Sequence, residues 1–199
     1  MGAMPSTDAI GFLRPTHRRA LLDLARRSIE HGSVHGLPLR IQPETLAPEL
    51  AVKRATFVTL ELHGKLRGCI GTLQAVRVLA EDVVHNAYAA AFRDPRFPPV
   101  SPSDVERLDI RLSLLTPAEP ISFTSEEDLL RQMTVGEDGL ILEEGFRRGT
   151  FLPTVWASLP DPKTFLQHLK LKAGLPEDYW SDSIKVYRYR TETIDKHSV

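Results

Sequence analysis

The segment Leu66-Arg67-Gly68-Cys69-Ile70-Gly71 contains the only cysteine of the chain and is the part best suited to chemistry. A nearby cation such as Arg67 favours the thiolate form of a cysteine, and the missing side chains at Gly68 and Gly71 would let a substrate approach the backbone. The pattern therefore fits a nucleophile at Cys69. It also fits a small buried side chain whose neighbouring glycines admit a closely packed helix.

His85 is the candidate base for such a nucleophile. It falls in a predicted helix over residues 79–92, and Asp82 lies three residues earlier on the same helix face. In a nucleophilic pair the base takes the thiol proton, and a third group orients the base. The sequence therefore predicts Cys69 and His85 as catalytic candidates, with Asp82 orienting the imidazole. Asn86 lies beside them, where it would bind a ligand or satisfy the backbone of a neighbouring loop.

A second polar cluster follows that helix, in Asp94-Pro95-Arg96-Phe97-Pro98-Pro99. Its prolines exclude a helix or a central strand and fix the shape of the bend, which lowers the entropy lost when charged groups are held there. Two readings are open: Asp94 and Arg96 clamp an anionic or amide substrate, or they pair with each other internally. The predicted substrate-binding residues are Arg67, Gly68, Gly71, Asn86, Asp94 and Arg96.

The elements that position these residues begin with a hairpin. Residues 55–62 and 65–73 are rich in β-branched and apolar side chains, and they flank His63-Gly64, a pair that accepts the positive φ of a two-residue turn. Such a turn pairs Leu62 with Lys65 and places Val58 opposite Cys69. Val58 as a neighbour favours a buried sulfur.

Strand pairs joined by short turns, with helices between them, predict an α+β fold with a mainly antiparallel sheet and flanking helices. The element order suggests two lobes. Residues 1–14 are expected to be a tag remnant and a mobile N-terminus, and residues 15–199 to form a single domain. The predicted helices are 15–32, 79–92, 101–108, 125–133, 152–159 and 163–173, and the predicted strands are 55–62, 65–73, 109–115, 140–143, 148–151 and 185–191.

Composition excludes several classes of protein. The chain has 199 residues and a formal net charge of −1, which gives no electrostatic case for a nucleic-acid binder. A single cysteine excludes an internal disulfide framework and a cysteine-based zinc site. No histidine-carboxylate metal motif, phosphate-binding loop or dinucleotide glycine pattern is present, so we expect no metal and no cofactor. No apolar run approaches the length of a membrane helix, and the expected location is the cytoplasm.

The chain resembles the AMMECR domain family, known in bacteria and archaea as AmmeMemoRadiSam system protein A. The signature Leu66–Gly71 carries the resemblance, which extends over about residues 15–191. Thr154 departs from it, since many prokaryotic relatives are expected to have glutamine there. Supporting segments are Thr56-Phe57-Val58-Thr59-Leu60, Asp94–Pro99, Ser113-Leu114-Leu115-Thr116 and Gly149-Thr150-Phe151-Leu152-Pro153.

The resemblance implies a two-lobed α+β fold with the signature near a cleft between the lobes. It also implies association with a Memo-type protein and a radical SAM enzyme, and it supplies no reaction. Three functions follow as alternatives: a small-molecule or nucleotide-directed site at the motif, a non-catalytic accessory module for those partners, or RNA binding. RNA binding would use arginines and the aromatics Trp156, Tyr179 and Trp180, whose apolar neighbours point instead to the core.

Overall fold

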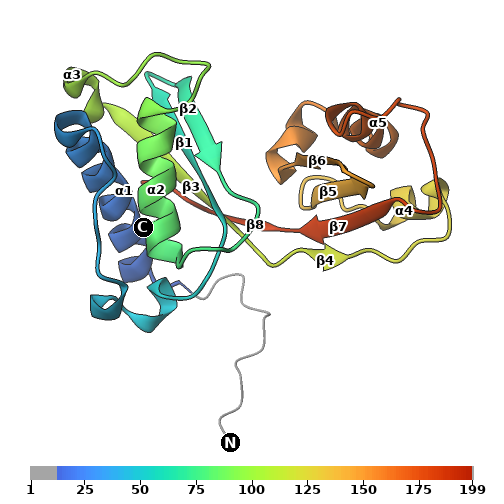
Figure 1. Cartoon of the computed structure of the whole chain (residues 1–199), viewed down its shortest axis with the longest axis horizontal. Coiled ribbons are helices and arrows are strands. Elements are labelled where there is room, and N and C mark those ends of the chain that lie inside the picture. Colours follow the sequence, from blue (N-terminus) through green and yellow to red (C-terminus); the bar gives the residue numbers. More distant parts are fainter. Residues whose placement is uncertain (1–12, 199) are drawn as a thin grey trace, which may run out of the picture. The chain divides into compact units, whose positions relative to one another are not determined.

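The computed structural model describes residues 13–198 and combines helices with two four-stranded sheets (Figure 1). This confirms the predicted α+β class. The expected tag remnant and N-terminal arm lie outside the described residues, apart from Leu13 and Arg14. The chain divides into two compact units, and the boundary crosses it twice. Unit 1 runs to Leu115 and resumes at Glu192, and unit 2 is Thr116–Thr191.

The sheet of unit 1 has the strand order β2-β1-β3-β8, so β2 is an edge strand. Strand β1 pairs antiparallel with both β2 and β3. A two-residue turn joins β1 to β2 at His63 and Gly64, which both adopt positive φ as predicted. The strands are β1 (Thr56–Leu62), β2 (Lys65–Gly71), β3 (Leu108–Leu115) and β8 (Thr191–Ile194).

Two long helices cover one face of this sheet, α1 (Pro15–His35) and α2 (Leu79–Phe92) (Figure 1). We predicted that α1 ends at Gly32, and this was wrong. The helix continues to His35, and Gly36 terminates it in the left-handed conformation at φ 70°. Gly32 instead makes room for the ring of Tyr88, which a Cβ at position 32 would approach to 2.6 Å.

The core of unit 1 lies between these helices and the sheet. Strand β1 contributes the fully buried side chains of Val58 and Leu60, and α2 contributes a small-residue face of alanines that lets it lie close to the strands. Short elements complete the unit: the 3₁₀ turns η1 (Pro43–Thr45) and η2 (Pro48–Leu50), and the helix α3 (Pro102–Val105), which is shorter than predicted.

Unit 2 has the strand order β4-β7-β5-β6 and its own core. The predicted hairpin is confirmed, with Gly145 and Phe146 between β5 and β6, and Ser125 caps α4 by accepting a hydrogen bond from the Asp128 amide at 3.1 Å. The elements are β4 (Glu119–Pro120), α4 (Glu126–Gln132), β5 (Gly139–Glu144), β6 (Arg147–Phe151), η3 (Pro153–Ala157), α5 (Pro162–Lys172) and β7 (Lys185–Tyr189).

The three aromatics considered for RNA stacking belong to this second core. Trp156 is buried, stacks on Phe165 with ring centroids 3.8 Å apart, and donates its indole N–H to the Asp138 carbonyl. Tyr179 and Trp180 pack partly buried against the same cluster. A buried ring offers no free face to a base, so Trp156 is a packing residue.

Candidate functional site

The hairpin register differs from the prediction at a single point. Leu62 pairs with Lys65 as expected, but a bulge at Arg67 then shifts every later pair by one residue. Cys69 therefore lies opposite Thr59 and not opposite Val58. Because side chains alternate between the two faces of a strand, the bulge moves the sulfur to the opposite face from the one predicted.

The two faces of this hairpin have different surroundings. Val58 and Leu60 point to the helices, and Gly68 lies on that side too, because a Cβ there would be 2.0 Å from the Ala90 carbonyl oxygen in α2. Thr59 and Cys69 point to the other side, which we call the open face. Cys69 is only half-buried, and its sulfur lies 3.3 Å from the Thr59 hydroxyl. The burial argued from Val58 was therefore wrong.

The proline-rich bend attaches directly to the backbone of Cys69. The Cys69 amide donates to the Asp94 carboxylate at 2.8 Å, and the Arg96 guanidinium donates to the Cys69 carbonyl oxygen at 3.1 Å. Strand β2 is an edge strand, whose outward N–H and C=O groups have no neighbouring strand. Asp94 and Arg96 thus form the hydrogen bonds to Cys69 that a further strand would otherwise form.

Asp94 and Arg96 are also paired with each other. The Asp94 carboxylate is buried and accepts from Arg96 Nε at 2.9 Å and from Arg96 Nη2 at 2.7 Å. The hydrogen bond from Arg96 holds the pKa of Asp94 well below its usual range, against the opposing effect of burial. Of the two readings open from the sequence, the structure has the internal pair. The guanidinium is half-exposed, and its hydrogen bond to Asp94, followed by the smaller effect of the nearby Cys69, raises the pKa of Arg96.

Arg67 and Gly71 hold the motif against its neighbours, Arg67 by a hydrogen bond and Gly71 by close packing. Arg67 donates to the Pro99 carbonyl oxygen at 3.0 Å and so holds the far end of the bend. A Cβ at Gly71 would lie 2.2 Å from the ring of Phe57, which occupies that space. The glycines therefore allow close packing on both faces of the hairpin, Gly68 against a helix and Gly71 against an aromatic ring.

Acid should remove the stability that the Asp94 carboxylate contributes. Because its pKa is lower in the folded chain than in the unfolded one, the contribution is present above about pH 4 and is lost as the pH falls from there. We expect Asp94→Asn to cost about 2 kcal/mol of unfolding free energy at neutral pH. The difference in unfolding free energy between this variant and wild type should become smaller in acid. Urea unfolding across pH measures both. A difference that stays constant down to pH 3 would contradict a stabilising role of the ionised Asp94 carboxylate.

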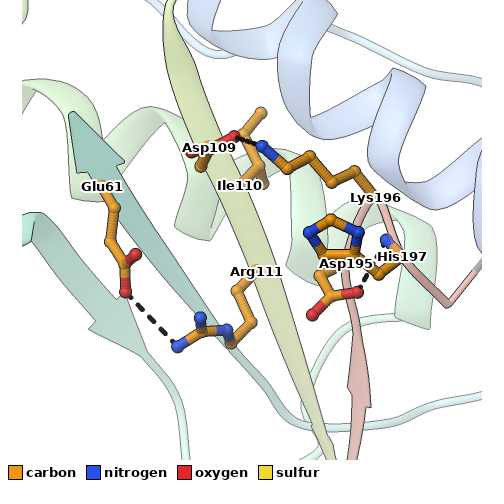
Figure 2. A pocket seen from close by; sticks show the side chains of 7 residues that line it. All are labelled: Glu61, Asp109, Ile110, Arg111, Asp195, Lys196 and His197. Carbon is orange, nitrogen blue, oxygen red and sulfur yellow. Dashed lines mark hydrogen bonds and ion pairs between the residues drawn. The ribbon is translucent and has the colours of Figure 1, made fainter. Parts of the chain in front are cut away.

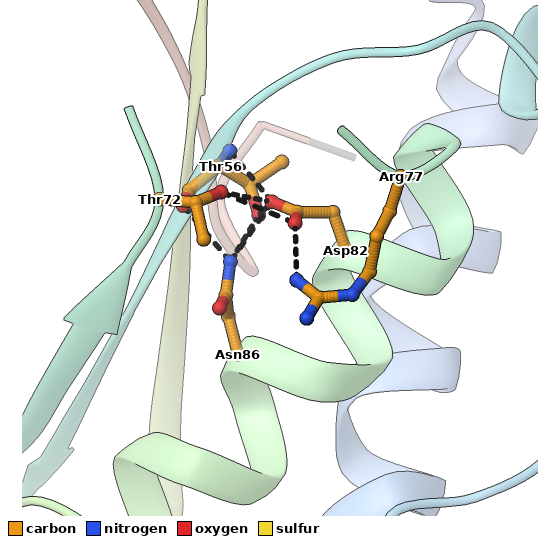
Figure 3. Close-up of polar contacts among 5 residues, drawn as sticks. All are labelled: Thr56, Thr72, Arg77, Asp82 and Asn86. Atoms are coloured by element: carbon orange, nitrogen blue, oxygen red, sulfur yellow. Dashed lines mark hydrogen bonds and ion pairs between the residues drawn. The ribbon is translucent and has the colours of Figure 1, made fainter. Parts of the chain in front are cut away.

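The structure does not bring His85 to Cys69. Asp82 is fully buried and does not orient the imidazole as predicted: its carboxylate accepts hydrogen bonds from Thr56 at the start of β1 and from Asn86 (Figure 3). Asn86 in turn donates to the Thr56 carbonyl oxygen at 3.0 Å. His85 is exposed on the helix side of the sheet, so the strands separate it from the sulfur.

The open face also carries a charged hollow of about 150 Å³ (Figure 2). In it the Arg111 guanidinium lies 3.3 Å from the Glu61 carboxylate, and Lys196 pairs with Asp109 at 2.5 Å. Thr59 connects the hollow to the thiol, because it pairs with Cys69 on one side and with Arg111 on the other. The lining residues are Glu61, Asp109, Ile110, Arg111, Asp195, Lys196 and His197.

Sequence reasoning missed these residues. Strand alternation alone would have placed Thr59 and Glu61 on one face of β1, with Asp109 and Arg111 on the matching face of β3. The turn after β8 carries no such signal, since its position depends on where the last strand joins the sheet. No group of three potential metal ligands occurs within residues 13–198. Within that same range, no helix is both long and apolar enough to cross a bilayer.

Comparison with known proteins finds relatives that match most of the chain. A protein of Methanothermobacter thermautotrophicus is 40% identical over 178 residues, covering 87% of this chain and 91% of that protein. A protein of Thermococcus gammatolerans is 42% identical, covering 88% of each. The crystal structure of an uncharacterized protein from Pyrococcus horikoshii superposes with a TM-score of 0.78 at 39% identity, over 87% of this chain and 88% of the other. The family model described as AMMECR1 matches residues 22–194, and the chain therefore belongs to the AMMECR1 family.

Proposed function

We propose that this protein is a non-catalytic accessory domain that uses the open face of unit 1 to hold a partner enzyme. One observation carries the proposal: the polar groups of the two motifs bind to each other. Asp94 and Arg96 attach to the backbone of Cys69, and Arg67 attaches to Pro99. A charge already engaged in an internal ion pair, as Arg96 is with the buried Asp94, is expensive to redirect to a substrate.

The thiol itself is poorly placed for nucleophilic work. Its neighbour on the open face is the Thr59 hydroxyl, and the positive charge of Arg96 is offset by the Asp94 carboxylate. A nucleophilic cysteine needs a base within hydrogen-bonding reach, and the predicted base lies on the other side of the sheet. Cys69 serves better as a small side chain that keeps the open face flat.

The proposed partners are a Memo-type protein and a radical SAM enzyme, in the cytoplasm. The open face suits a protein partner because it mixes both charge signs around a shallow hollow, with Arg111 and Lys196 beside Glu61 and Asp109. Complementary charges fix the orientation of two proteins and speed their encounter more than they add affinity. Arg111 is half-exposed and can reach a partner carboxylate.

Isothermal titration of the full chain with each proposed partner tests the surface. Arg111→Glu should weaken binding by about tenfold or more, because it places like charge beside Glu61 and reverses the sign presented to the partner. Arg147→Glu, an exposed position at the β5–β6 hairpin of unit 2, is the matched control and should bind as wild type. The proposal is refuted if both variants lose affinity equally, or if the wild-type chain gives no heat of binding with either partner.

Replacement of the thiol separates the accessory role from a covalent one. Cys69→Ser and Cys69→Ala should keep partner binding and any partner-dependent activity within about twofold of wild type, since neither change touches the backbone groups held by Asp94 and Arg96. Thermal unfolding confirms that each variant is folded. A folded Cys69→Ala protein that still binds the partner but lacks activity in the partner assay would instead support a nucleophile, the alternative function at this motif.

A further inference from the structure

A second cavity, of about 360 Å³, lies on the helix side of unit 1 and contains the histidine that the motif does not use. One wall is the loop 37–41, which follows α1. The other wall is the N-terminal half of α2, through Glu81, Val84 and His85. Its size falls within the range of cavities that bind small molecules.

Three hydrogen bonds, one of them fully buried, fix the walls of this cavity. Ser28 of α1 is fully buried and donates to the Val84 carbonyl oxygen at 2.8 Å, and its hydroxyl accepts from the Leu39 amide at 3.3 Å. The Tyr88 hydroxyl donates to the Gly36 carbonyl oxygen at 2.5 Å, at the start of the loop. A cavity held open in this way loses little conformational entropy when a ligand enters it.

Three polar residues line the cavity, namely Arg40, Glu81 and His85. Within residues 13–198, the side chains of Arg40, Glu81 and His85 form no hydrogen bond or ion pair with the protein. Partial burial, followed by the charge of Arg77, lowers the pKa of His85 against the raising effects of Glu81 and Asp82. The lowered pKa favours the neutral imidazole, which offers one donor and one acceptor.

The rest of the lining is apolar. Val84 is buried, Leu39 and Ile41 are half-buried, and Leu37 is 61% exposed at the rim. Burying an apolar ligand group against this strip is favourable in proportion to the area removed from water. The cavity thus combines an apolar strip with one cation, one carboxylate and one neutral imidazole.

We propose that this cavity binds a small zwitterion with an apolar body, of the size and class of an apolar α-amino acid. A simple organic anion would meet repulsion from Glu81, and a simple amine would meet repulsion from Arg40. A molecule carrying both charges satisfies each side chain with its opposite, while its apolar body covers Leu39 and Ile41.

The test uses the full chain and three probes of one shape: L-phenylalanine, 3-phenylpropanoate, which lacks the ammonium, and phenethylamine, which lacks the carboxylate. Nuclear magnetic resonance follows the His85 ring and the amides of residues 37–41 during titration. Phenylalanine should shift these signals saturably, and each truncated probe should bind about tenfold more weakly, because it leaves one charged side chain unpaired. If no probe shifts the His85 ring saturably, the site is refuted.

Two variants identify the charges involved. Arg40→Gln should weaken the binding of phenylalanine about tenfold and strengthen that of phenethylamine, because it removes the repulsion between Arg40 and the amine. Glu81→Gln should likewise weaken the binding of phenylalanine and strengthen that of 3-phenylpropanoate. Arg147→Gln, on the hairpin of unit 2, is the matched control and should change nothing. If 3-phenylpropanoate binds wild type as tightly as phenylalanine does, or if the control variant loses affinity equally, the proposed ligand class is wrong. Neither outcome depends on the partner binding proposed for the open face.

Discussion

Replacement of Gly68 by alanine should lower the free energy of unfolding by about 4 kcal/mol, a loss at the upper end for single substitutions. The new methyl group would lie 2.0 Å from the Ala90 carbonyl oxygen and 2.9 Å from its carbonyl carbon. A flexible side chain could move away, but this obstacle is the backbone of α2. Strand and helix would have to separate, which opens the core between them. Urea denaturation followed by circular dichroism measures the loss.

Two further variants show whether the backbone contact is the cause. Leu66→Ala, at a position of β2 that is 45% exposed, should cost less than about 1 kcal/mol. Ala90→Gly combined with Gly68→Ala should not restore stability, because deleting the Ala90 methyl group leaves the carbonyl oxygen in place. Recovery in the double variant would mean that side-chain crowding, and not the helix backbone, excludes alanine at position 68.

Asp82→Ala should cost about 3–5 kcal/mol, the usual loss when one member of a buried charged network is removed. The fully buried carboxylate accepts from the Thr56 amide at 2.9 Å, from Asn86 Nδ2 at 2.9 Å and from the Thr72 hydroxyl at 3.0 Å, and it lies 3.3 Å from Arg77 Nη1 (Figure 3). It therefore joins the start of β1, the end of β2 and α2. Alanine would leave these donors buried without an acceptor.

Asp82→Asn distinguishes charge from connection. The amide oxygen can still accept from Thr56, but its NH₂ group would face other donors, so we expect an intermediate loss of about 2 kcal/mol. Asp23→Ala, at an exposed position of α1, is the control and should stay within about 0.5 kcal/mol of wild type. If Asp82→Ala unfolds at the same denaturant concentration as the control, the network does not stabilise the fold.

These two sites also bear on the proposed function. Gly68 sets the distance between β2 and α2, and Asp82 joins β1 to α2. Both therefore hold the hairpin whose other side forms the open face. A loss of partner binding in Gly68 or Asp82 variants would follow from unfolding, whereas Arg111→Glu changes the open face while leaving these contacts intact.

Local sequence patterns predicted most of the elements. Helix α2 matches the predicted range 79–92 because its alanines and apolar residues repeat at helical spacing. The His63-Gly64 turn is equally local, since few residue pairs accept positive φ at adjacent positions. We predicted the end of α1 too early because a glycine usually ends a helix. Gly32 instead makes room for Tyr88, which lies far along the chain.

The contacts of the candidate site depended on longer-range information. One extra residue at Arg67 reverses the face of every residue after it in β2, and no local signal marks a bulge. The pairing of Asp82 with Thr56, and the position of His85 beside residues 37–41, depend on how α2 is rotated against the sheet. That rotation is set by the packing of whole faces.

The sequence by itself determined the α+β class, the hairpin, and the presence of a glycine-flanked thiol followed by a proline-stiffened bend, because propensities and turn preferences act over a few residues. Only the tertiary structure decided that Asp94 and Arg96 bind the backbone of Cys69, that the sulfur points away from the helices, and that His85 belongs to a different cavity. These outcomes depend on strand register and on the packing of distant segments, which are settled by the total burial and hydrogen bonding of the fold.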